Sequence, residues 1–289
     1  MVASSIYSYR VPGGADTGRG DHRTGEINPA DTMLKAIAFD LWETLITDTP
    51  DLSRRQERLR LTRMEEILRG RGHGAIADRI EHAYRALWSR CQDLYWSADV
   101  DIPCRRHIEH FLEELQLAPA SFDEPVLAEL EHAYAGAALE ILPAVVAGAP
   151  QALSEIKSRG FGVGLISNTG RTPGSVLRAI LDALGMSASI DVMVFSNEHG
   201  QCKPRPSIFE ELRRGLGVRY DEMVFVGDNL YADVHGAQRC GMRAVHFQPP
   251  VRGTAVAPHI EHGLEIVPDA RVTALADLLP ALERLQDEA

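Results

Sequence analysis

Residues 36–46 of the chain read Ala36-Ile37-Ala38-Phe39-Asp40-Leu41-Trp42-Glu43-Thr44-Leu45-Ile46, so an apolar run ends in an acid that a hydroxyl residue follows four positions later. Such a run between polar segments is typical of a buried strand in a parallel sheet. Ligands of open α/β sheets bind at the carboxyl ends of such strands. Asp40 is therefore a candidate for chemistry, although an acid here can also simply cap a strand or a following helix.

The composition suits a globular protein with a proper core, because 45% of the 289 residues are hydrophobic. This length accommodates one large α/β domain, or one domain that carries a sizeable insertion. The formal net charge of −11 argues against binding to nucleic acids or to anionic membranes, since both require a basic face. A small anionic substrate is still compatible with it, because a site can be positive locally.

The four cysteines are scattered and form no C-x-x-C pair, which argues against structural zinc and against a disulfide framework. We expect them to be reduced thiols. No run of 18 apolar residues occurs, and the N-terminus lacks the apolar core of a secretory signal. The prediction is a soluble cytoplasmic protein without a membrane partner, and either a monomer or a homodimer fits it.

The character of the sequence changes twice along the chain. Residues 1–32 show almost no apolar periodicity and are predicted to be a flexible N-terminal extension. Residues 49–142 have helical apolar spacing without a convincing strand, which predicts an inserted helical cap domain. Strand–helix alternation returns at Pro143, so residues 33–48 and 143–289 together are predicted to form the core.

Repeated strand–helix units predict an α/β fold with a doubly wound parallel sheet. The predicted strands lie at about 34–39, 161–166, 192–195, 223–226 and 244–247. The predicted core helices lie at about 149–159, 175–184, 207–216 and 274–285, and residues 250–263 are predicted to be a loop.

The aromatic and histidine residues of the cap are expected to be structural. Trp88, Tyr95 and Trp96 are predicted to lie in the cap core or at its rim, although one ring could face a substrate. Five histidines lack metal-ligand spacing against acids and are predicted to be packed or solvated: His73, His82, His107, His110 and His132.

Polar side chains follow four of the predicted strands, and parallel strands share one carboxyl edge. These groups are Asp40 with Thr44, Ser167 with Asn168, Lys203, and Asp228 with Asp233. Carboxylate oxygens suit Mg²⁺, which takes one or two carboxylates together with water and substrate oxygens. A lysine offsets the charge that develops on phosphoryl oxygens. The pattern predicts a site for a phosphoryl group and a divalent metal ion.

At these segments the chain resembles the haloacid dehalogenase superfamily of hydrolases. The matching segments are FDLWETL at 39–45, ISNT at 166–169, KPRPSIF at 203–209 and VGDNLYAD at 226–233. The resemblance covers about residues 34–250 and fits the members with a helical cap. It implies a Rossmann-like core and, as substrate, a small phosphorylated metabolite.

The resemblance implies catalytic roles for several of these residues. Asp40 would be the nucleophile and would form an aspartyl-phosphate intermediate, which splits one hard displacement into two. Thr44 and Ser167 would hydrogen-bond the phosphoryl oxygens. Lys203 would bind the same oxygens and steady Asp40, and Asn168 is expected beside the substrate.

The resemblance also implies a magnesium site. Asp40, Asp228 and the backbone carbonyl of Trp42 would hold Mg²⁺. Asp233 would complete this site by orienting Lys203 or a metal-bound water. The side chain of Trp42 is expected beside the substrate.

One position departs from the family pattern. Phosphatases of this family usually carry a second aspartate two residues after the nucleophile, which protonates the leaving oxygen and then activates water. Trp42 occupies this position and can do neither, and the loss of a positioned acid/base typically costs ~10²–10⁴ in rate. Glu43 is adjacent and could substitute, but the usual turn would point its side chain away from the pocket of Asp40.

Two other functions stay open. Haloacid dehalogenases proper also replace the second aspartate, because halide leaves without a proton. They resemble one another in neutralising the metal-binding motif, whereas this chain keeps Asp228, which without a cation would repel Asp40 and favour protonation of one of them. The retained acid therefore favours phosphoryl chemistry. A former phosphatase kept as a binding or regulatory module would need none of these acids or Lys203.

Overall fold

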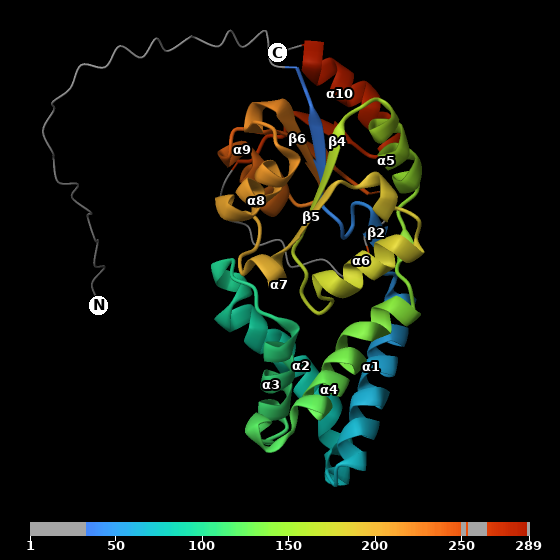
Figure 1. Ribbon diagram of the computed structural model, residues 1–289, viewed down its shortest axis with the longest axis vertical. Coiled ribbons are helices and arrows are strands. Elements are labelled where there is room, and N and C mark those ends of the chain that lie inside the picture. The colour runs from blue at the N-terminus through green and yellow to red at the C-terminus, as the bar shows by residue number, and fades with distance from the viewer. Residues whose placement is uncertain (1–32, 250–252, 254–264, 288–289) are drawn as a thin grey trace, which may run out of the picture.

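The computed structural model describes residues 33–249, 253 and 265–287 (Figure 1). The predicted N-terminal extension and nearly all of the predicted loop at 250–263 lie outside these residues. In the described part, no helix combines the length and the apolar character that crossing a bilayer requires.

A six-stranded parallel sheet forms the centre of the core, in the order β5-β4-β1-β6-β7-β8. In chain order its strands are β1 Ala36–Phe39, β4 Gly162–Ser167, β5 Val192–Phe195, β6 Met223–Gly227, β7 Arg243–Phe247 and β8 Ala270–Val272. β1 pairs with β4 on one side and with β6 on the other, so that Phe39 lies opposite Leu165 and Val226. The residue that follows β1 therefore emerges at the middle of the carboxyl edge.

Helices cover both faces of the sheet, which is why the central strands are apolar throughout. On one face Ile37 and Phe39 pack in a cluster with residues of α5 Ala149–Ser158, α6 Gly174–Ala183 and α10 Leu278–Asp287. On the other face Ala36 and Ala38 pack with α8 Pro206–Leu216 and α9 Gly236–Arg239. This arrangement confirms the predicted doubly wound α/β fold.

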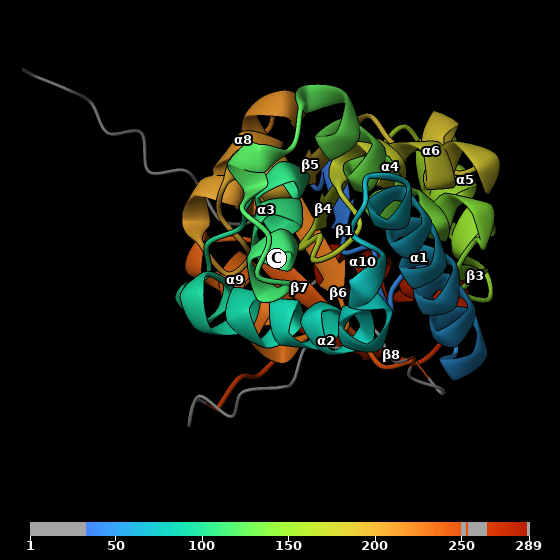
Figure 2. The same cartoon turned by 90° about the horizontal axis from the view of Figure 1, so that it is seen from below.

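Four long helices stand beyond the carboxyl edge of the sheet and form the inserted cap (Figures 1 and 2). They are α1 Pro50–Gly70, α2 Ala77–Leu94, α3 Cys104–Glu114 and α4 Glu124–Glu140. Thr49 and Asp123 cap α1 and α4 by accepting hydrogen bonds from Leu52 N and Val126 N. The cap has its own hydrophobic cluster, separate from the two clusters of the core.

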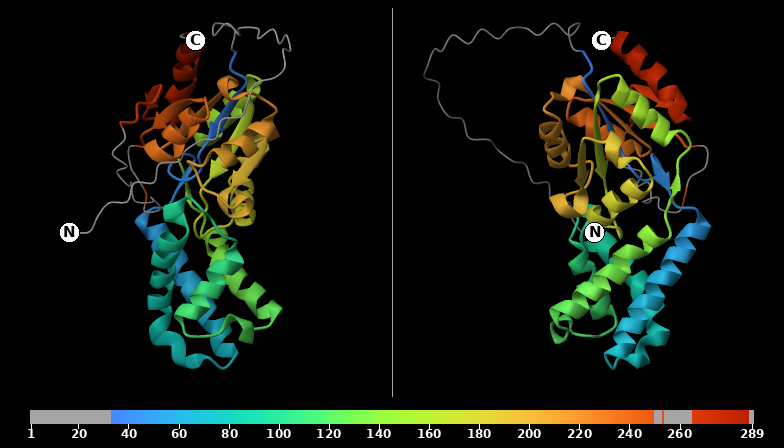
Figure 3. Two further views of the ribbon diagram at one scale, coloured as in Figure 1. Left: turned by 90° about the vertical axis from the view of Figure 1, so that its left-hand side faces the viewer. Right: turned by 45° about the vertical axis from the view of Figure 1, so that its right-hand side comes forward.

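Two chain segments next to the sheet connect the cap to the core. The short strands β2 Ile46–Thr47 and β3 Ala144–Val145 pair antiparallel where the chain enters and leaves the helical block (Figure 3). All four cap helices lie within the predicted range 49–142. As expected, the cap rings are packed: Trp88 and Trp96 lie 4.6 Å apart between centroids, and His107 and His110 are buried.

The structure differs from the predictions at two places in the core. β8 was not predicted, since three residues are too few to show a period. The last α-helix begins at Leu278, after a 3₁₀ turn at Leu275–Asp277, and not at Ala274. Pro280 explains the late start, because proline fits only the first turn of a helix.

Candidate active site

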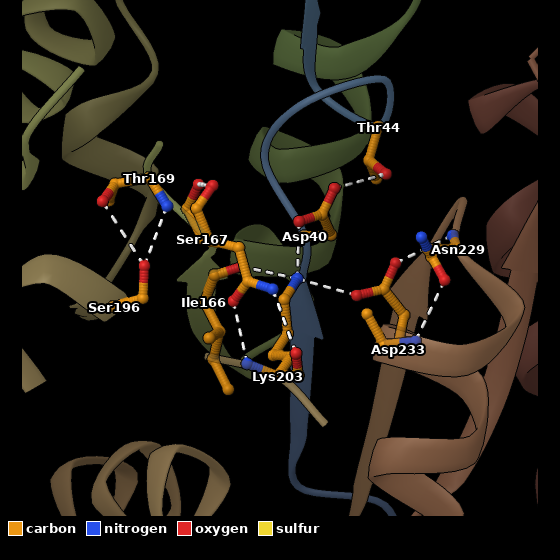
Figure 4. A network of polar contacts seen from close by, with 11 residues as sticks. Asp40, Thr44, Ile166, Ser167, Thr169, Ser196, Lys203, Asn229 and Asp233 are labelled. Atoms are coloured by element: carbon orange, nitrogen blue, oxygen red, sulfur yellow. Dashed lines mark hydrogen bonds and ion pairs between the residues drawn. The ribbon is translucent and has the colours of Figure 1, made fainter. Parts of the chain in front are cut away.

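The four sequence motifs meet at the carboxyl edge of the sheet (Figure 4). Asp40 directly follows β1, Ser167 ends β4, and Asp228 directly follows β6. Lys203 lies between the short helix α7 Ser196–His199 and α8. The predicted convergence of these side chains thus follows from the central position of β1 between β4 and β6.

Asp40 is buried and its two carboxylate oxygens have different partners. Its Oδ1 accepts a hydrogen bond from Lys203 Nζ at 2.5 Å, and its Oδ2 accepts one from Thr44 Oγ1 at 3.1 Å. Burial raises the pKa of Asp40 to about 6, against the opposing effect of the Lys203 ammonium, and the nearby Asp233 adds to the increase. The carboxylate is therefore held in place but incompletely neutralised by the protein.

Lys203 is the cation of the cluster. Its Nζ lies 2.7 Å from Asp233 Oδ1 and donates to the backbone oxygen of Ile166 at 3.1 Å, in addition to Asp40. Burial alone would lower the pKa of Lys203, but the carboxylates of Asp233 and Asp40 outweigh burial and raise it above its ordinary value. Lys203 is therefore an ammonium that bridges the ends of β1 and β6.

Asp233 is placed by the turn that follows β6. It lies on a π-helical segment, Leu230–His235, and its Oδ2 accepts a hydrogen bond from Asn229 N at 2.9 Å. The side-chain oxygen of Asn229 accepts hydrogen bonds from Tyr231 N and Ala232 N and caps this segment. A Cβ at Gly227 would come within 2.3 Å of Asp233 Oδ2, so glycine is required there.

Three buried carboxylates gather in one cluster at this edge of the sheet. Asp40, Asp228 and Asp233 each offer an oxygen, and these atoms lie within 4.8 Å of one another. Lys203 forms ion pairs with Asp40 and Asp233 of this cluster. The donor set of the cluster is made of hard oxygen atoms, which fits Mg²⁺.

Asn168, in the ISNT segment, supports the backbone of Lys203. Asn168 Nδ2 donates to Lys203 O at 3.1 Å, and Asn168 Oδ1 accepts from Lys203 N at 2.8 Å. Its amide therefore positions Lys203, a role the sequence did not predict, and direct contact with a substrate stays a prediction. Ser167 is fully buried, and with the residues that the structure describes its Oγ makes only a long contact of 3.5 Å, to Asn168 O.

The position of the missing aspartate holds a partly buried Trp42 that packs against the core cluster. The adjacent Glu43 has a φ of +61°, and its carboxylate accepts hydrogen bonds from Thr47 Oγ1 at 2.9 Å and from Gly253 N at 2.6 Å. These partners engage Glu43 outside the Asp40 cluster, as the expected turn implies. Both oxygens of Glu43 are therefore engaged by residues that do not belong to that cluster.

Three further residues join this edge to which the sequence analysis gave no role. Thr169 follows Asn168, Ser196 follows β5, and Asp101 comes from the cap between α2 and α3. Thr169 N donates to Ser196 Oγ at 2.8 Å, and both hydroxyls donate to Asp101 Oδ2 (Figure 4 shows Thr169 and Ser196). Only the presence of Thr169 in the ISNT segment could have pointed to them.

Comparison with known proteins gives one family. Residues 34–241 match the model of the haloacid dehalogenase-like hydrolases. A glyceraldehyde 3-phosphate phosphatase of Pyrococcus furiosus is 29% identical over 253 residues, which cover 87% of this chain and 94% of that protein. A ribulose-1,5-bisphosphate 5-phosphatase of Halopiger xanaduensis is 27% identical, with 85% of this chain and 98% of that protein covered.

Solved structures share the fold. A 2-haloacid dehalogenase from Pseudomonas syringae pv. Tomato DC3000 has a TM-score of 0.61 at 24% identity, covering 88% of this chain and all of that one. A haloacid dehalogenase-type phosphatase from Thermococcus onnurineus has a TM-score of 0.51 at 22% identity, covering 86% of this chain and 98% of that one. Since the family model spans most of the chain and all four motifs meet at one sheet edge, the chain belongs to the haloacid dehalogenase-like hydrolases.

Proposed function

We propose that this hydrolase is a Mg²⁺-dependent phosphatase that acts on a phosphate monoester of a small metabolite. One observation carries the proposal: one carboxylate oxygen from each of Asp40, Asp228 and Asp233 lies within 4.8 Å of the other two, as the ligands of a cation do. Hydrolysis of a carbon–halogen bond needs no metal ion, so it gives no use for a cluster of three buried acids that includes the nucleophile. The phosphatases among the relatives support the same reaction class.

In this proposal Asp40 attacks the phosphorus atom, a bond forms between them, and the bond to the leaving oxygen breaks. Lys203 offsets charge on the phosphoryl oxygens and keeps Asp40 ionised. Thr44 and Ser167 supply hydroxyls at the same edge, and Ser167 is suited to turn toward a phosphoryl oxygen because its present contact is weak. Water then hydrolyses the aspartyl phosphate and regenerates Asp40.

Asp40, Asp228 and the backbone carbonyl of Trp42 are the proposed ligands of Mg²⁺. The bound ion would supply positive charge that polarises the phosphoryl group. Asp233 is engaged on both oxygens, by Lys203 and by Asn229 N, so its contribution to the metal site is to orient the lysine and ordered water. Asp40 and Asp228 are buried, which would strengthen their interactions with the ion.

Trp42 restricts the substrates that can react well. A leaving alkoxide needs a proton, and Trp42 has none to give, whereas an acyl or aryl oxygen leaves as a stable anion. We therefore expect activated phosphate esters to react fastest. The cap would close over the site, exclude water and choose among metabolites.

The test is phosphate release from p-nitrophenyl phosphate by the full chain, with Mg²⁺ and with a chelator. The proposal requires release that needs Mg²⁺ and a rate that falls steeply as the pKa of the leaving group rises across a series of esters. A flat dependence on leaving-group pKa would contradict the role given to Trp42. A panel of phosphorylated metabolites then identifies the substrate.

The aromatic residue at the acid position favours one second candidate, a 2-haloacid dehalogenase. Chloride release from 2-chloropropionate that is unaffected by chelator would establish it and overturn the phosphatase. Neither activity, with Mg²⁺ still bound, would indicate a binding or regulatory module.

A further inference from the structure

Asp101 is a buried carboxylate at the boundary between cap and core. Its Oδ1 accepts hydrogen bonds from Trp96 Nε1 at 3.0 Å and Ile102 N at 2.9 Å, both within the cap. Its Oδ2 accepts from Thr169 Oγ1 at 3.0 Å and from Ser196 Oγ, both on the core. One side chain thus joins the two parts of the molecule, with each oxygen committed to one of them.

Burying a carboxylate costs desolvation free energy, so a carboxylate that only filled space would be unfavourable at this position. Asp101 is 4% exposed, and within the described ranges no lysine, arginine or histidine forms an ion pair with it. A buried charge without a counter-ion is retained only where several good donors surround it. Four neutral donors do so here, which makes the position of this carboxylate sharply defined.

A first route leads from Asp101 to the active site through side chains. Thr169, which Asp101 holds through its hydroxyl, is the residue after Asn168. Asn168 makes hydrogen bonds to both the backbone N and the backbone O of Lys203. A shift of the loop at Thr169 would therefore move the support of Lys203.

A second route leads there through the backbone. Asp101 N donates to Gly200 O at 3.1 Å, and Cys202 N donates to Asp99 O at 2.9 Å. These bonds pair the cap segment around Val100 antiparallel with the core segment around Gln201. Lys203 is the next residue along the core segment.

We propose that Asp101 is a positioning residue for hydrolysis: from the cap, it sets the position of Lys203 relative to Asp40. Both routes end at Lys203, whose Nζ lies 2.5 Å from Asp40 Oδ1. The position of the cap on the core is therefore coupled to the distance between Lys203 and Asp40. The inference rests on the proposed phosphatase function for its kinetic readout. A tether that only held the cap in place would affect substrate binding alone.

The test compares Asp101→Ala and Asp101→Asn with the control Asp93→Asn in the full chain. Asp93 is an exposed acid near the end of α2 in the same cap and belongs to neither route. With p-nitrophenyl phosphate and Mg²⁺, we expect kcat of Asp101→Ala to fall about 10- to 100-fold, as for a misplaced catalytic group. KM and kcat of Asp93→Asn should stay within about twofold of the wild type.

Asp101→Asn should retain more activity than Asp101→Ala. The carboxamide oxygen can still accept from Trp96 and Ile102, while its NH₂ donates to the hydroxyls of Thr169 and Ser196, which can accept. An increase of KM at unchanged kcat in Asp101→Ala would overturn the inference and leave only a tether. Equal losses in the alanine and asparagine variants would contradict the hydrogen-bond route.

Two further measurements keep the inference testable if Asp101→Ala does not fold or the wild type releases no phosphate. Ser196→Ala removes the Ser196–Asp101 hydrogen bond from the core side. In the double variant with Asp101→Asn, kcat should fall by less than the product of the two single effects. Amide hydrogen exchange needs no substrate: segment 199–205 should exchange about tenfold faster in Asp101→Ala, which loses the side-chain hydrogen bonds, than in Asp93→Asn. Unchanged exchange there would overturn the inference, whatever the fate of the phosphatase proposal.

Discussion

The carboxyl edge of the sheet and the ring of His107 in the cap both involve buried ionisable groups, but charge is kept in the first and lost in the second. At the edge, Asp40 and Asp233 stay close to the charged Lys203. In the cap, burial lowers the pKa of His107 from 6.5 to about 4, so this ring is neutral and packs between Trp96 and Tyr134. Charge is thus retained where we propose chemistry, whereas at His107 it is suppressed and the ring serves packing.

The largest expected effect is a loss of activity when a charged side chain is removed from the edge. Asp40→Asn keeps the shape of the side chain but abolishes the nucleophile, so we expect the rate of phosphate release to fall about 10⁴-fold or more. Phosphate release under saturating Mg²⁺ measures this, and circular dichroism shows that the variant is folded. Residual activity above one-tenth of the wild type would place the nucleophile elsewhere.

Adding an acid at the edge should change the rate of phosphate release by a smaller factor. Trp42→Asp places a carboxyl two residues after Asp40, where it can protonate a leaving oxygen, and we expect the rate on alkyl phosphates to rise about 100-fold. Aryl phosphates, whose leaving groups need no proton, should gain less than about threefold. The ratio of the two rates is the measurement, and an equal change on both substrates would indicate altered packing instead.

The suppressed charge of His107 should make the free energy of unfolding depend on pH. The folded pKa of His107 lies below its ordinary value, so its contribution to stability is present above pH 6.5 and is lost as the pH falls toward 4. Between pH 7 and pH 5 this linkage is worth about 2 kcal/mol of unfolding free energy. In His107→Phe this part of the acid loss should vanish.

Urea unfolding of both proteins at the two pH values measures this difference. The exposed His82 provides a matched control, because His82→Gln should leave the pH dependence of the wild type unchanged. The assignment fails if His107→Phe and the wild type lose equal stability between pH 7 and pH 5.

The smallest expected effect compares the two regions without any turnover. Mg²⁺ at ten times its dissociation constant should stabilise the folded chain by about 1.4 kcal/mol, since the carboxylate cluster that would bind it exists only in the folded state. Asp228→Asn should remove this stabilisation, whereas His107→Phe should keep it. Thermal unfolding with and without Mg²⁺ provides the measurement, and a shift that survives in Asp228→Asn would place the ion elsewhere.

The amino-acid sequence by itself determined the order of the elements and the residues of the cluster. Apolar runs predicted five of the six strands, and each motif stands at the end of one strand or in the loop after it, as Asp40 does after β1. Since parallel strands share their carboxyl edge, local patterns were sufficient to predict which side chains converge. The family resemblance then assigned their chemistry.

Only the tertiary structure decided how these residues are held. Asp101 lies 68 positions from Thr169 and 95 from Ser196 along the chain, and no local period records a hydrogen bond between side chains so far apart. The engagement of Glu43 by Thr47 and Gly253 likewise depends on a turn with positive φ and on a residue more than 200 positions away. Secondary structure follows from neighbours in the chain, whereas the cap–core contacts follow from how two separately packed units meet.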